Sequence, residues 1–396
     1  MYIHELKGPW MNHPFWRTRF VLKDMADLQK LRDCQLQEVV IDLGRGVDVL
    51  PELVETPPTD KDMIMLELNG PTVEGIPDNS ATIKQTPLDA EHRQAARIIQ
   101  ASRKEIASMF ADLRMGKVIE VSALLPLVDE ISASVGRNTH ALISLVRLKT
   151  ADDYTYMHSI AVCALMTTLA RALQLSGEEV RRAGLAGLMH DMGKAGVPLQ
   201  ILNKPGVLTD HEFNVIRQHP ELGYEMLLKA NITDAVTLDV CLHHHEKEDG
   251  SGYPGKLVGS ELSIFAKMAA ICDVYDAVTS ARAYKPGWEP GIALSRMASW
   301  EGHFDQGVFK AFVKSLGIYP IGTLVMLKSG RLAVVVRQSP DSLLRPVVKA
   351  FFSTKSLVYI PVEEIDLSRL GADEIVSNES SASWGINNIE HLWMSQ

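Results

Sequence analysis

The sequence predicts a mainly α protein with a small mixed α/β N-terminal domain and a short β-rich segment near the C-terminus. From about residue 118 to 315, apolar residues recur at helical spacing between short Gly- and Pro-containing breaks. Runs rich in β-branched residues are confined to the first 50 residues and to the region after Pro320. The 396 residues suffice for two to three domains of about 150 residues each.

Composition and charge narrow the class of protein. Hydrophobic residues make up 46% of the chain and charged residues 22%, which is typical of a globular protein with a real core. Lys and Arg number 40 against 49 Asp and Glu, so the net charge is −9. This balance argues against general nucleic-acid binding, which needs a basic surface. A small phosphorylated ligand can still be held in a local basic pocket.

The cysteines and the N-terminus predict a cytoplasmic protein. Cys34, Cys163, Cys241 and Cys272 are too few for a disulfide framework and lack metal-knuckle spacing, and the last three lie in apolar runs. The first residues show neither the basic nor the apolar region of a secretory signal. No window approaches 18 uninterrupted apolar residues, so we expect no membrane span.

The N-terminal part divides into a domain and a linker. Residues 1–50 contain short β-like runs and a helix-like stretch, and Leu36–Leu43 is predicted to be a strand that ends at Gly44. Residues 51–88 are rich in Pro, Thr, Asp and Gly and have weak periodicity. We interpret 51–88 as a linker and therefore place a domain boundary there.

Helices are predicted to occupy the middle of the chain. Connecting helices are assigned to 89–144, and the first begins near Asp89 with apolar residues recurring on one face. That helix packs on its own domain, connects domains or forms a dimer contact. A second domain is assigned to 145–318, in which 159–170 is apolar nearly all round and therefore predicts a buried helix.

The C-terminal region predicts strands followed by a loose end. A short β segment is assigned to 319–370 and a polar, loosely held tail to 371–396. The expected strands are Thr323–Leu327, Leu332–Val336, Lys349–Phe352 and Leu357–Ile360, the first two joined by a turn containing Ser-Gly-Arg.

Histidine is concentrated in one part of the chain. Of 13 histidines, seven lie within 158–245, where even spacing would place about three. Clustered imidazoles beside carboxylates are typical of a metal site, although an isolated histidine is more often a core or surface residue. The seven are His158, His190, His211, His219, His243, His244 and His245.

Several of these residues have neighbours that favour metal binding. His190 and Asp191 are adjacent in the apolar context GLMHDMGK, where a buried pair is costly unless it is hydrogen-bonded or binds metal. His244 and His245 follow an apolar segment and precede the turn DGSGYPG; a solvated surface run is the alternative. Asp273 lies in an apolar helix, where carboxylates are rarely left unpaired.

Taken together, the motifs resemble one family of hydrolases. DDYTYMHS, HDMGKAGVP with ILNKPGVLT, HPELG, HHEKEDGSGYPG and DVYDAVTSARAYK follow one another over about residues 145–315. In order and spacing they resemble the HD-GYP family, a subset of the HD-domain metal-dependent phosphohydrolases, with the GYP tripeptide at 252–254. HPFWRTRFVLKD and VVIDLGRG are similar to an N-terminal accessory domain often attached to such bacterial proteins.

The resemblance implies a helical HD-type fold that hydrolyses the bacterial second messenger cyclic di-GMP. It implies two divalent metal ions, with iron or manganese favoured. The implied ligands are His158, His190, Asp191, His219, His244, His245 and Asp273. Some relatives place Glu four residues before the first ligand; Tyr154 stands here, so we expect two metals rather than three. His211 and His243 match no ligand position.

The chemistry of phosphodiester cleavage explains these residue types. Two divalent ions lower the pKa of a bridging water, polarise the phosphoryl oxygens and support in-line displacement. Asp191 is our choice for the bridging carboxylate and a catalytic residue. Lys194, three residues later, is expected to lie on the same face, to contact phosphate and to stabilise charge as the P–O bond breaks.

Four further residues are assigned to the substrate. Arg282 and Lys285 resemble the family's basic pair that holds phosphate or a guanine edge; a solvated helix end is the alternative. Tyr253 is expected to shape the pocket wall or stack on a base. Asp276 is expected to order a ligand or a water in the outer sphere of the site.

Three functions are weighed. The leading hypothesis is a phosphodiesterase that converts cyclic di-GMP to pGpG, and to GMP if both bonds are cut. A non-catalytic cyclic dinucleotide receptor or adaptor is the second, and a hydrolase of another nucleotide, such as a mixed cyclic dinucleotide, the third. A homodimer and diguanylate cyclase or other signalling partners remain open as further partners.

Overall fold

The computed structural model describes the strand backbones of the N-terminal part and most of the chain beyond it. The described residues are 2–7, 20–21, 38–41, 85–118, 120–148, 154–204, 206–280, 287–339, 341–386 and 388–394. The chain divides into two compact units, Met1–Thr59 and Asp60–Gln396. The linker predicted at 51–88 lies outside the described residues up to residue 84.

The first unit contains a three-stranded antiparallel sheet. Its strands are β1 (Tyr2–Lys7), β2 (Phe20–Val21) and β3 (Glu38–Ile41), in the order β2-β1-β3. The strand predicted within 36–43 is therefore present as β3. The helix-like stretch expected here, like Cys34, lies outside the described residues.

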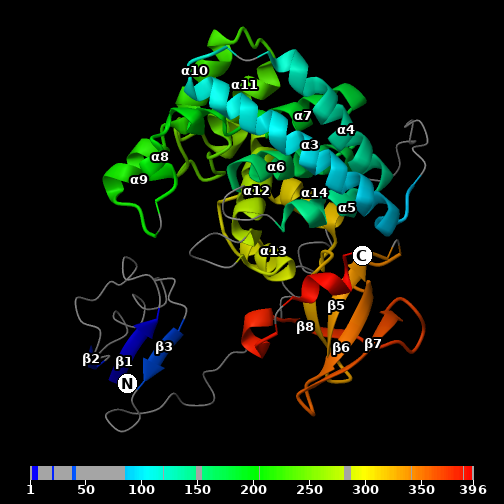
Figure 1. Cartoon of the computed structure of the whole chain (residues 1–396). Helices are drawn as coiled ribbons and strands as arrows, with labels where there is room; N and C mark the ends of the chain where they lie inside the picture. The colour runs from blue at the N-terminus through cyan, green and yellow to red at the C-terminus, as the bar shows by residue number, and fades with distance from the viewer. Residues whose placement is uncertain are drawn as a thin grey trace. The chain divides into compact units, whose positions relative to one another are not determined.

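The second unit is mainly helical, as predicted (Figure 1). Short 3₁₀ helices join several of its α-helices, including η5 (Met192–Gly196). The α-helices are α3 (Leu88–Arg114), α4 (Leu125–Arg137), α5 (Thr139–Val146), α6 (Tyr154–Ala172), α7 (Gly177–Met189), α8 (Leu199–Leu202), α9 (Asp210–Ile216), α10 (His219–Lys229), α11 (Ala235–His243), α12 (Ile264–Thr279), α13 (Pro290–Ala298) and α14 (Gln306–Leu316).

The long helix α3 packs on its own domain. It contacts α4, α5 and α6, and its apolar face, which includes Ala95, Ile106 and Met109, is buried in one core with theirs. Near its start, the buried Glu91 accepts hydrogen bonds from Ser134 at 2.8 Å and from Arg137 at 2.7 Å. A buried carboxylate paired in this way fixes α3 against α4.

Helix α6 is the centre of the helical body. Almost all of its side chains from 157 to 170 are buried, because α7, α12 and α14 pack around it as well as α3 to α5. This confirms the buried helix predicted from an apolar surface on all sides. Cys163, Cys241 and Cys272 are free and buried, as expected.

A five-stranded antiparallel sheet follows the helices. Its strands are β4 (Leu324–Leu327), β5 (Arg331–Arg337), β6 (Val347–Ser353), β7 (Val358–Asp366) and β8 (Ile375–Asn378), in the order β7-β6-β5-β4-β8. On β5, Ala333 and Val335 join the core of α12 and α14, whereas Leu332 and Val334 join a second cluster. Because successive side chains of a strand point to opposite faces, each face of the sheet packs in a separate hydrophobic cluster.

The C-terminal end differs from the loose tail expected over 371–396. β8 completes the sheet beside β4, and Ile386, Ile389, Leu392 and Trp393 are buried against the second sheet face. Trp393 is only 4% exposed. The prediction rested on the polar average of this stretch. Its few apolar residues nevertheless cover a sheet face that would otherwise be exposed to water.

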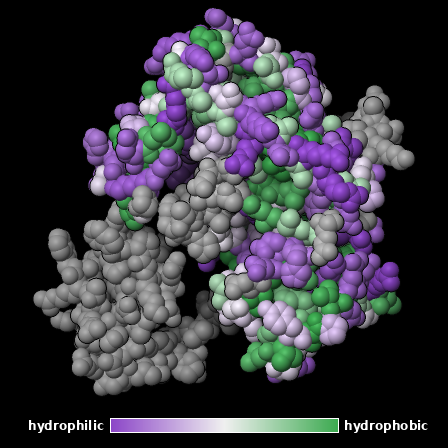
Figure 2. All heavy atoms as spheres, viewed as in Figure 1, coloured by the Kyte–Doolittle hydropathy of each residue, from purple (hydrophilic) through white to green (hydrophobic). Residues whose placement is uncertain are grey.

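The outer surface is mixed. Figure 2 shows hydrophilic residues over much of the visible face of the helical part, with smaller apolar areas between them. Among the described residues, no helix has both the length and the apolar character needed to cross a membrane.

Candidate metal centre

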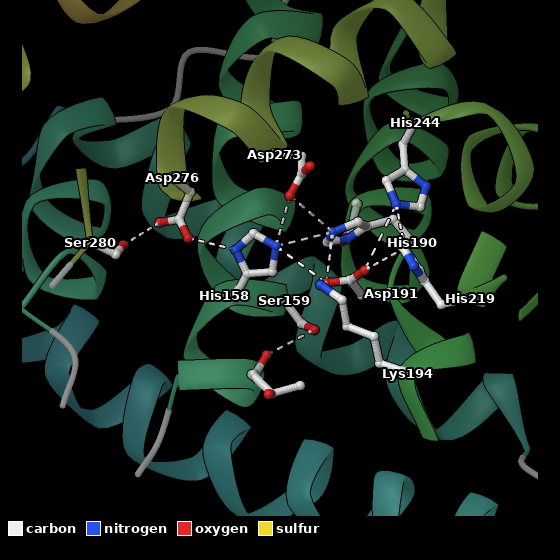
Figure 3. Close-up of polar contacts among 12 residues, drawn as sticks. His158, Ser159, His190, Asp191, Lys194, His219, His244, Asp273, Asp276 and Ser280 are labelled. Carbon is white, nitrogen blue, oxygen red and sulfur yellow. Dashed lines mark hydrogen bonds and ion pairs between the residues drawn. The ribbon is translucent and has the colours of Figure 1, made fainter. Parts of the chain in front are cut away.

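Five helical elements bring the predicted metal ligands to one place, and Figure 3 shows those other than His245. The contributing elements are α6, the end of α7, the start of α10, the end of α11 and α12. Only His245 is partly exposed; the others are at most 6% exposed. The residues that converge are His158 from α6, His190 and Asp191 after α7, His219 on α10, His244 and His245 after α11, and Asp273 on α12.

Asp191 lies between two groups of imidazoles. Its Oδ2 is 3.3 Å from His158 Nε2 and 3.4 Å from His190 Nε2. Its Oδ1 is 3.2 Å from His219 Nε2 and 3.8 Å from His244 Nε2. Oδ1 is buried and accepts no hydrogen bond among the described residues. A buried carboxylate oxygen without a donor is costly, so its surroundings fit a cation.

The histidine tautomers point free lone pairs into the site. Nδ1 of His190, His219 and His244 each faces a backbone carbonyl at 2.8, 2.8 and 3.0 Å and must therefore donate. In a neutral ring, Nε2 then carries a lone pair. His219 Nε2 lies 3.1 Å from His244 Nε2, and His190 Nε2 lies 3.2 Å from His158 Nε2. Two lone pairs this close together repel one another unless a cation lies between them, so each pair of imidazoles is suited to binding one metal ion.

The electrostatics of the centre also favour bound cations. Burial lowers the pKa of His245 to about 3 and that of His244 well below its usual value, which keeps both rings neutral. Burial opposes ionisation of Asp191 as well, but Lys194 and His190 outweigh it and hold the pKa of this carboxyl well below its usual range. Neutral imidazoles beside ionised carboxylates are a donor set for divalent transition metals.

His158 experiences the largest concentration of negative charge. Burial opposes its protonation, but hydrogen bonds with Asp191, Asp273 and Asp276 together raise the pKa of this imidazole to about 10. The three carboxylates thus attract positive charge to this ring, which a metal ion can supply in place of a proton.

The donors form two triads linked by Asp191. His219, His244 and His245 place ligand atoms within 4.8 Å of one another, and so do His158, His190 and Asp273. A third such group combines Asp191 with one histidine from each triad. The residues present therefore fit two neighbouring divalent ions.

Asp276 lies behind His158, where the outer-sphere role expected for it would place it. This carboxylate is 3% exposed, and its Oδ2 accepts from His158 Nδ1 at 2.6 Å. Ser280 donates to its other oxygen at 3.5 Å. Asp276 therefore orients the ring of His158 from behind. Asp276 lies one turn after Asp273, which directs both side chains toward His158.

Lys194 reaches the centre from a 3₁₀ turn rather than from an α-helix. Its Nζ donates to Asp191 Oδ2 at 2.5 Å, and its side chain is 19% exposed. The turn η5 follows Asp191 directly and packs on α10, which begins at His219. The ammonium is thus held at the edge of the donor cluster, within reach of solvent.

The GYP loop lies against the metal centre. The ring of Tyr253 stacks on that of His245 with centroids 4.7 Å apart. The buried Glu246 fastens the loop by accepting from the backbone N–H groups of Gly255 at 2.5 Å and Leu257 at 3.2 Å. Sequence reasoning missed Glu246, although a carboxylate directly after the histidine run is the feature that marks it.

Four other residues were singled out from the sequence. Arg282 and Lys285 fall within 281–286, outside the described residues. His243 forms an ion pair with Asp239 at 2.8 Å, and His211 is exposed, so neither joins the donor set. Sequence reasoning also missed Arg217, whose guanidinium carbon lies 4.5 Å from the centroid of the Tyr253 ring.

Comparison with known proteins identifies the family of this chain. Residues 129–308 match the HD domain family, and residues 1–124 match a domain of unknown function, DUF3391. The cyclic di-GMP phosphodiesterase PA4108 of Pseudomonas aeruginosa is 49% identical over 395 residues, 99% of this chain and 92% of that protein. The cyclic di-GMP phosphodiesterase response regulator RpfG of Xanthomonas campestris is 43% identical over 37% of this chain and 39% of its own.

One solved structure is also similar. Bd1817, an HDG"Y"P protein from Bdellovibrio bacteriovorus, aligns with 76% of this chain and 89% of its own, with a TM-score of 0.47 and 16% identity. Fold, donor set and family match define a metal-dependent hydrolase of the HD-domain class. Within that class, the chain belongs to the HD-GYP family, as the near full-length relative and the intact GYP loop establish.

Proposed function

We propose that this protein is a cyclic di-GMP phosphodiesterase that acts through two divalent metal ions. The observation that carries the proposal is the position of Asp191, whose two oxygens face two separate donor groups. That arrangement is what a bridging carboxylate requires. The substrate is supported by the name of the relative that is 49% identical over 99% of this chain.

Seven side chains would hold the ions. His158, His190 and Asp273 would bind one ion, His219, His244 and His245 the other, and Asp191 both. When bound, two such ions lower the pKa of water and polarise phosphoryl oxygens. Imidazole-rich donors favour iron, manganese, zinc, cobalt or nickel over magnesium, and the family resemblance favours iron or manganese.

The protein's own groups would position the phosphodiester and keep the ligands oriented. Lys194 Nζ, beside Asp191, is placed to donate to a phosphoryl oxygen and to balance charge that develops on it. Asp276 holds His158 in the tautomer whose Nε2 faces the centre. Tyr253 forms a wall beside His245, and Arg282 and Lys285 are proposed to contact the nucleotide.

The proposed reaction adds water across one P–O3′ bond of the cyclic dinucleotide. The phosphorus gains a hydroxyl oxygen, and the departing ribose oxygen takes a proton and becomes a 3′-hydroxyl. The product is linear pGpG; a second addition gives GMP. We propose a cytoplasmic location for this activity, in keeping with a soluble intracellular substrate; homodimerisation and signalling partners remain predictions.

Reconstitution tests the proposal directly. The purified protein is loaded anaerobically with Fe(II) or Mn(II), metal content is measured, and cyclic di-GMP products are resolved by chromatography over time. We expect pGpG, followed by GMP if both bonds are cut. Binding without turnover, in protein that holds two metals, would instead support a receptor.

Two variants sharpen the experiment. His190→Ala combined with Asp191→Ala removes one ligand and the bridge, and we expect loss of turnover with the helical circular dichroism retained. His243→Ala is the matched control, because His243 directly precedes the ligand pair but contacts Asp239 instead. Full activity in the double variant would overturn the metal assignment.

A further inference from the structure

An arm of the helical body lacks a core of its own. Helices α8 and α9 contain no buried residue, and Figure 1 shows them at one side of the body. Lys204 ties the arm together by an ion pair with Glu212 at 2.6 Å. Phe213 on α9 is 49% exposed and Val207 69% exposed. An element that does not contribute to the core is free to serve binding.

Arg217 links this arm to the GYP loop. It is the residue directly after α9 and lies two residues before the proposed ligand His219. Its guanidinium carbon is 4.5 Å from the centroid of Tyr253 and 5.8 Å from that of Phe213. Since Tyr253 stacks on His245, a column of stacked groups leads from the metal centre to Arg217.

The hydrogen-bonding groups of Arg217 are left available. Within the described part of the chain, the guanidinium of Arg217 contacts the two aromatic rings and forms no ion pair. A guanidinium that stacks on an aromatic ring keeps the N–H groups around its edge available for hydrogen bonds. A rigid fork of donors beside an exposed aromatic ring suits a flat ligand with paired acceptors.

Guanine carries the complementary pair of acceptors. Its O6 and N7 accept two parallel hydrogen bonds from one arginine, whereas adenine places the N6 donor beside N7. A phosphate is expected nearer the donor cluster, where Lys194 lies beside Asp191, whereas Arg217 contacts the Tyr253 ring that stacks on His245. The exposed face of Phe213 offers a stacking surface for a base.

We propose that Arg217 is a specificity-determining residue that binds the O6/N7 edge of a guanine base, with Phe213 beside that base. The proposal rests on the proposed function, since it names how one base of the same substrate is recognised. It implies that the arm of α8 and α9 contributes to selection of guanine over adenine, while bond cleavage depends on the centre beneath it.

The test compares nucleotides in the metal-loaded full-length protein. Wild type, Arg217→Ala and Arg217→Lys are titrated calorimetrically with GMP and AMP, and kcat and KM are measured with cyclic di-GMP and cyclic di-AMP. Bis(p-nitrophenyl) phosphate, which has no base, reports on the centre alone. Arg181→Ala is the matched control, because it also removes one positive charge. Arg181 lies on α7 and forms an exposed ion pair with Asp129 on α4.

Loss of one bidentate contact predicts a selective defect. For Arg217→Ala we expect GMP affinity to fall roughly 10- to 100-fold, with a matching rise in KM for cyclic di-GMP. AMP affinity, hydrolysis of the baseless ester and metal content stay within about twofold. Arg217→Lys keeps the charge but loses the fork, so we expect it to lose most of the guanine preference as well.

Two results would overturn the proposal. An equal loss for GMP and AMP would mean that Arg217 binds phosphate or supports the fold, and unchanged GMP affinity would mean that it does not bind the base. Failure of the proposed function is a separate result: wild type would bind GMP in preference to AMP, through Arg217, yet not hydrolyse cyclic di-GMP.

Discussion

Replacing Gly193 with Ala should disrupt the metal centre by forcing η5 away from α10. Gly193 lies in η5, two residues after the proposed bridge Asp191, where this turn crosses the start of α10. A β-carbon added at this position would lie 1.8 Å from the carbonyl oxygen of His219 and 2.5 Å from the backbone nitrogen of Gly223. Ordinary van der Waals contact begins at 3.4 Å, so the added β-carbon would overlap both atoms. Both belong to the backbone of α10, which cannot move aside as a side chain can.

The size of the effect follows from this geometry. No rotamer change relieves a clash between backbones, so η5 and α10 must separate by roughly 1.5 Å, and we expect a loss of about 3 kcal/mol or more in unfolding free energy. The same separation moves His219 away from Asp191. Because metal–ligand distances tolerate only about 0.2 Å, we also expect the variant to lose metal.

Urea unfolding followed by circular dichroism, together with metal analysis, measures both effects. Gly196→Ala is the matched control in the same turn, since its added β-carbon would meet only side-chain ends, Met226 Cε at 3.2 Å and Leu222 Cδ1 at 3.4 Å. We expect that control to stay within about 0.5 kcal/mol of wild type and to keep its metals. A Gly193→Ala protein that matched the control in both measurements would refute the reasoning.

Three further predictions concern positioning, acid stability and the C-terminal end. Asp276→Ala removes the acceptor for His158 Nδ1 at 2.6 Å, and metal affinity, measured by chelator competition, should fall about 10- to 100-fold; unchanged affinity would contradict the positioning role. Burial lowers the pKa of His140 to about 4, whereas an unfolded histidine titrates near 6.5. The unfolded chain therefore binds more protons between these values, so this group should cost roughly 1 to 2 kcal/mol of stability as pH falls from about 7 to 5. His140→Leu should flatten that part of the pH profile of urea unfolding, and an unchanged profile would assign the effect to other groups. Trp393→Ala should lower the unfolding free energy by about 3 to 5 kcal/mol, and a loss under about 1 kcal/mol would show that this side chain does not cover the sheet.

Much of the fold followed from local patterns. The apolar surface of 159–170 predicted the buried helix α6, and the spacing of Ala95, Ile106 and Met109 predicted the buried face of α3. Periodicity could not decide what α3 packs against, because an apolar face specifies burial but not a partner. The prediction of a loose tail over 371–396 was wrong for the same reason. Its few apolar residues do not reveal from the sequence that they pack against a sheet face.

The candidate site shows the same division. The sequence alone predicted the donor residues that the structure brings together, since the histidine motifs and the GYP loop indicate their family and donor types, but it did not indicate Glu246 or Arg217. Only the tertiary structure decided that Asp191 directs its two oxygens to separate triads, that Asp276 lies behind His158 and that Arg217 rests on Tyr253. Those relations join residues from different helices and loops, so they depend on how the elements pack rather than on their order along the chain.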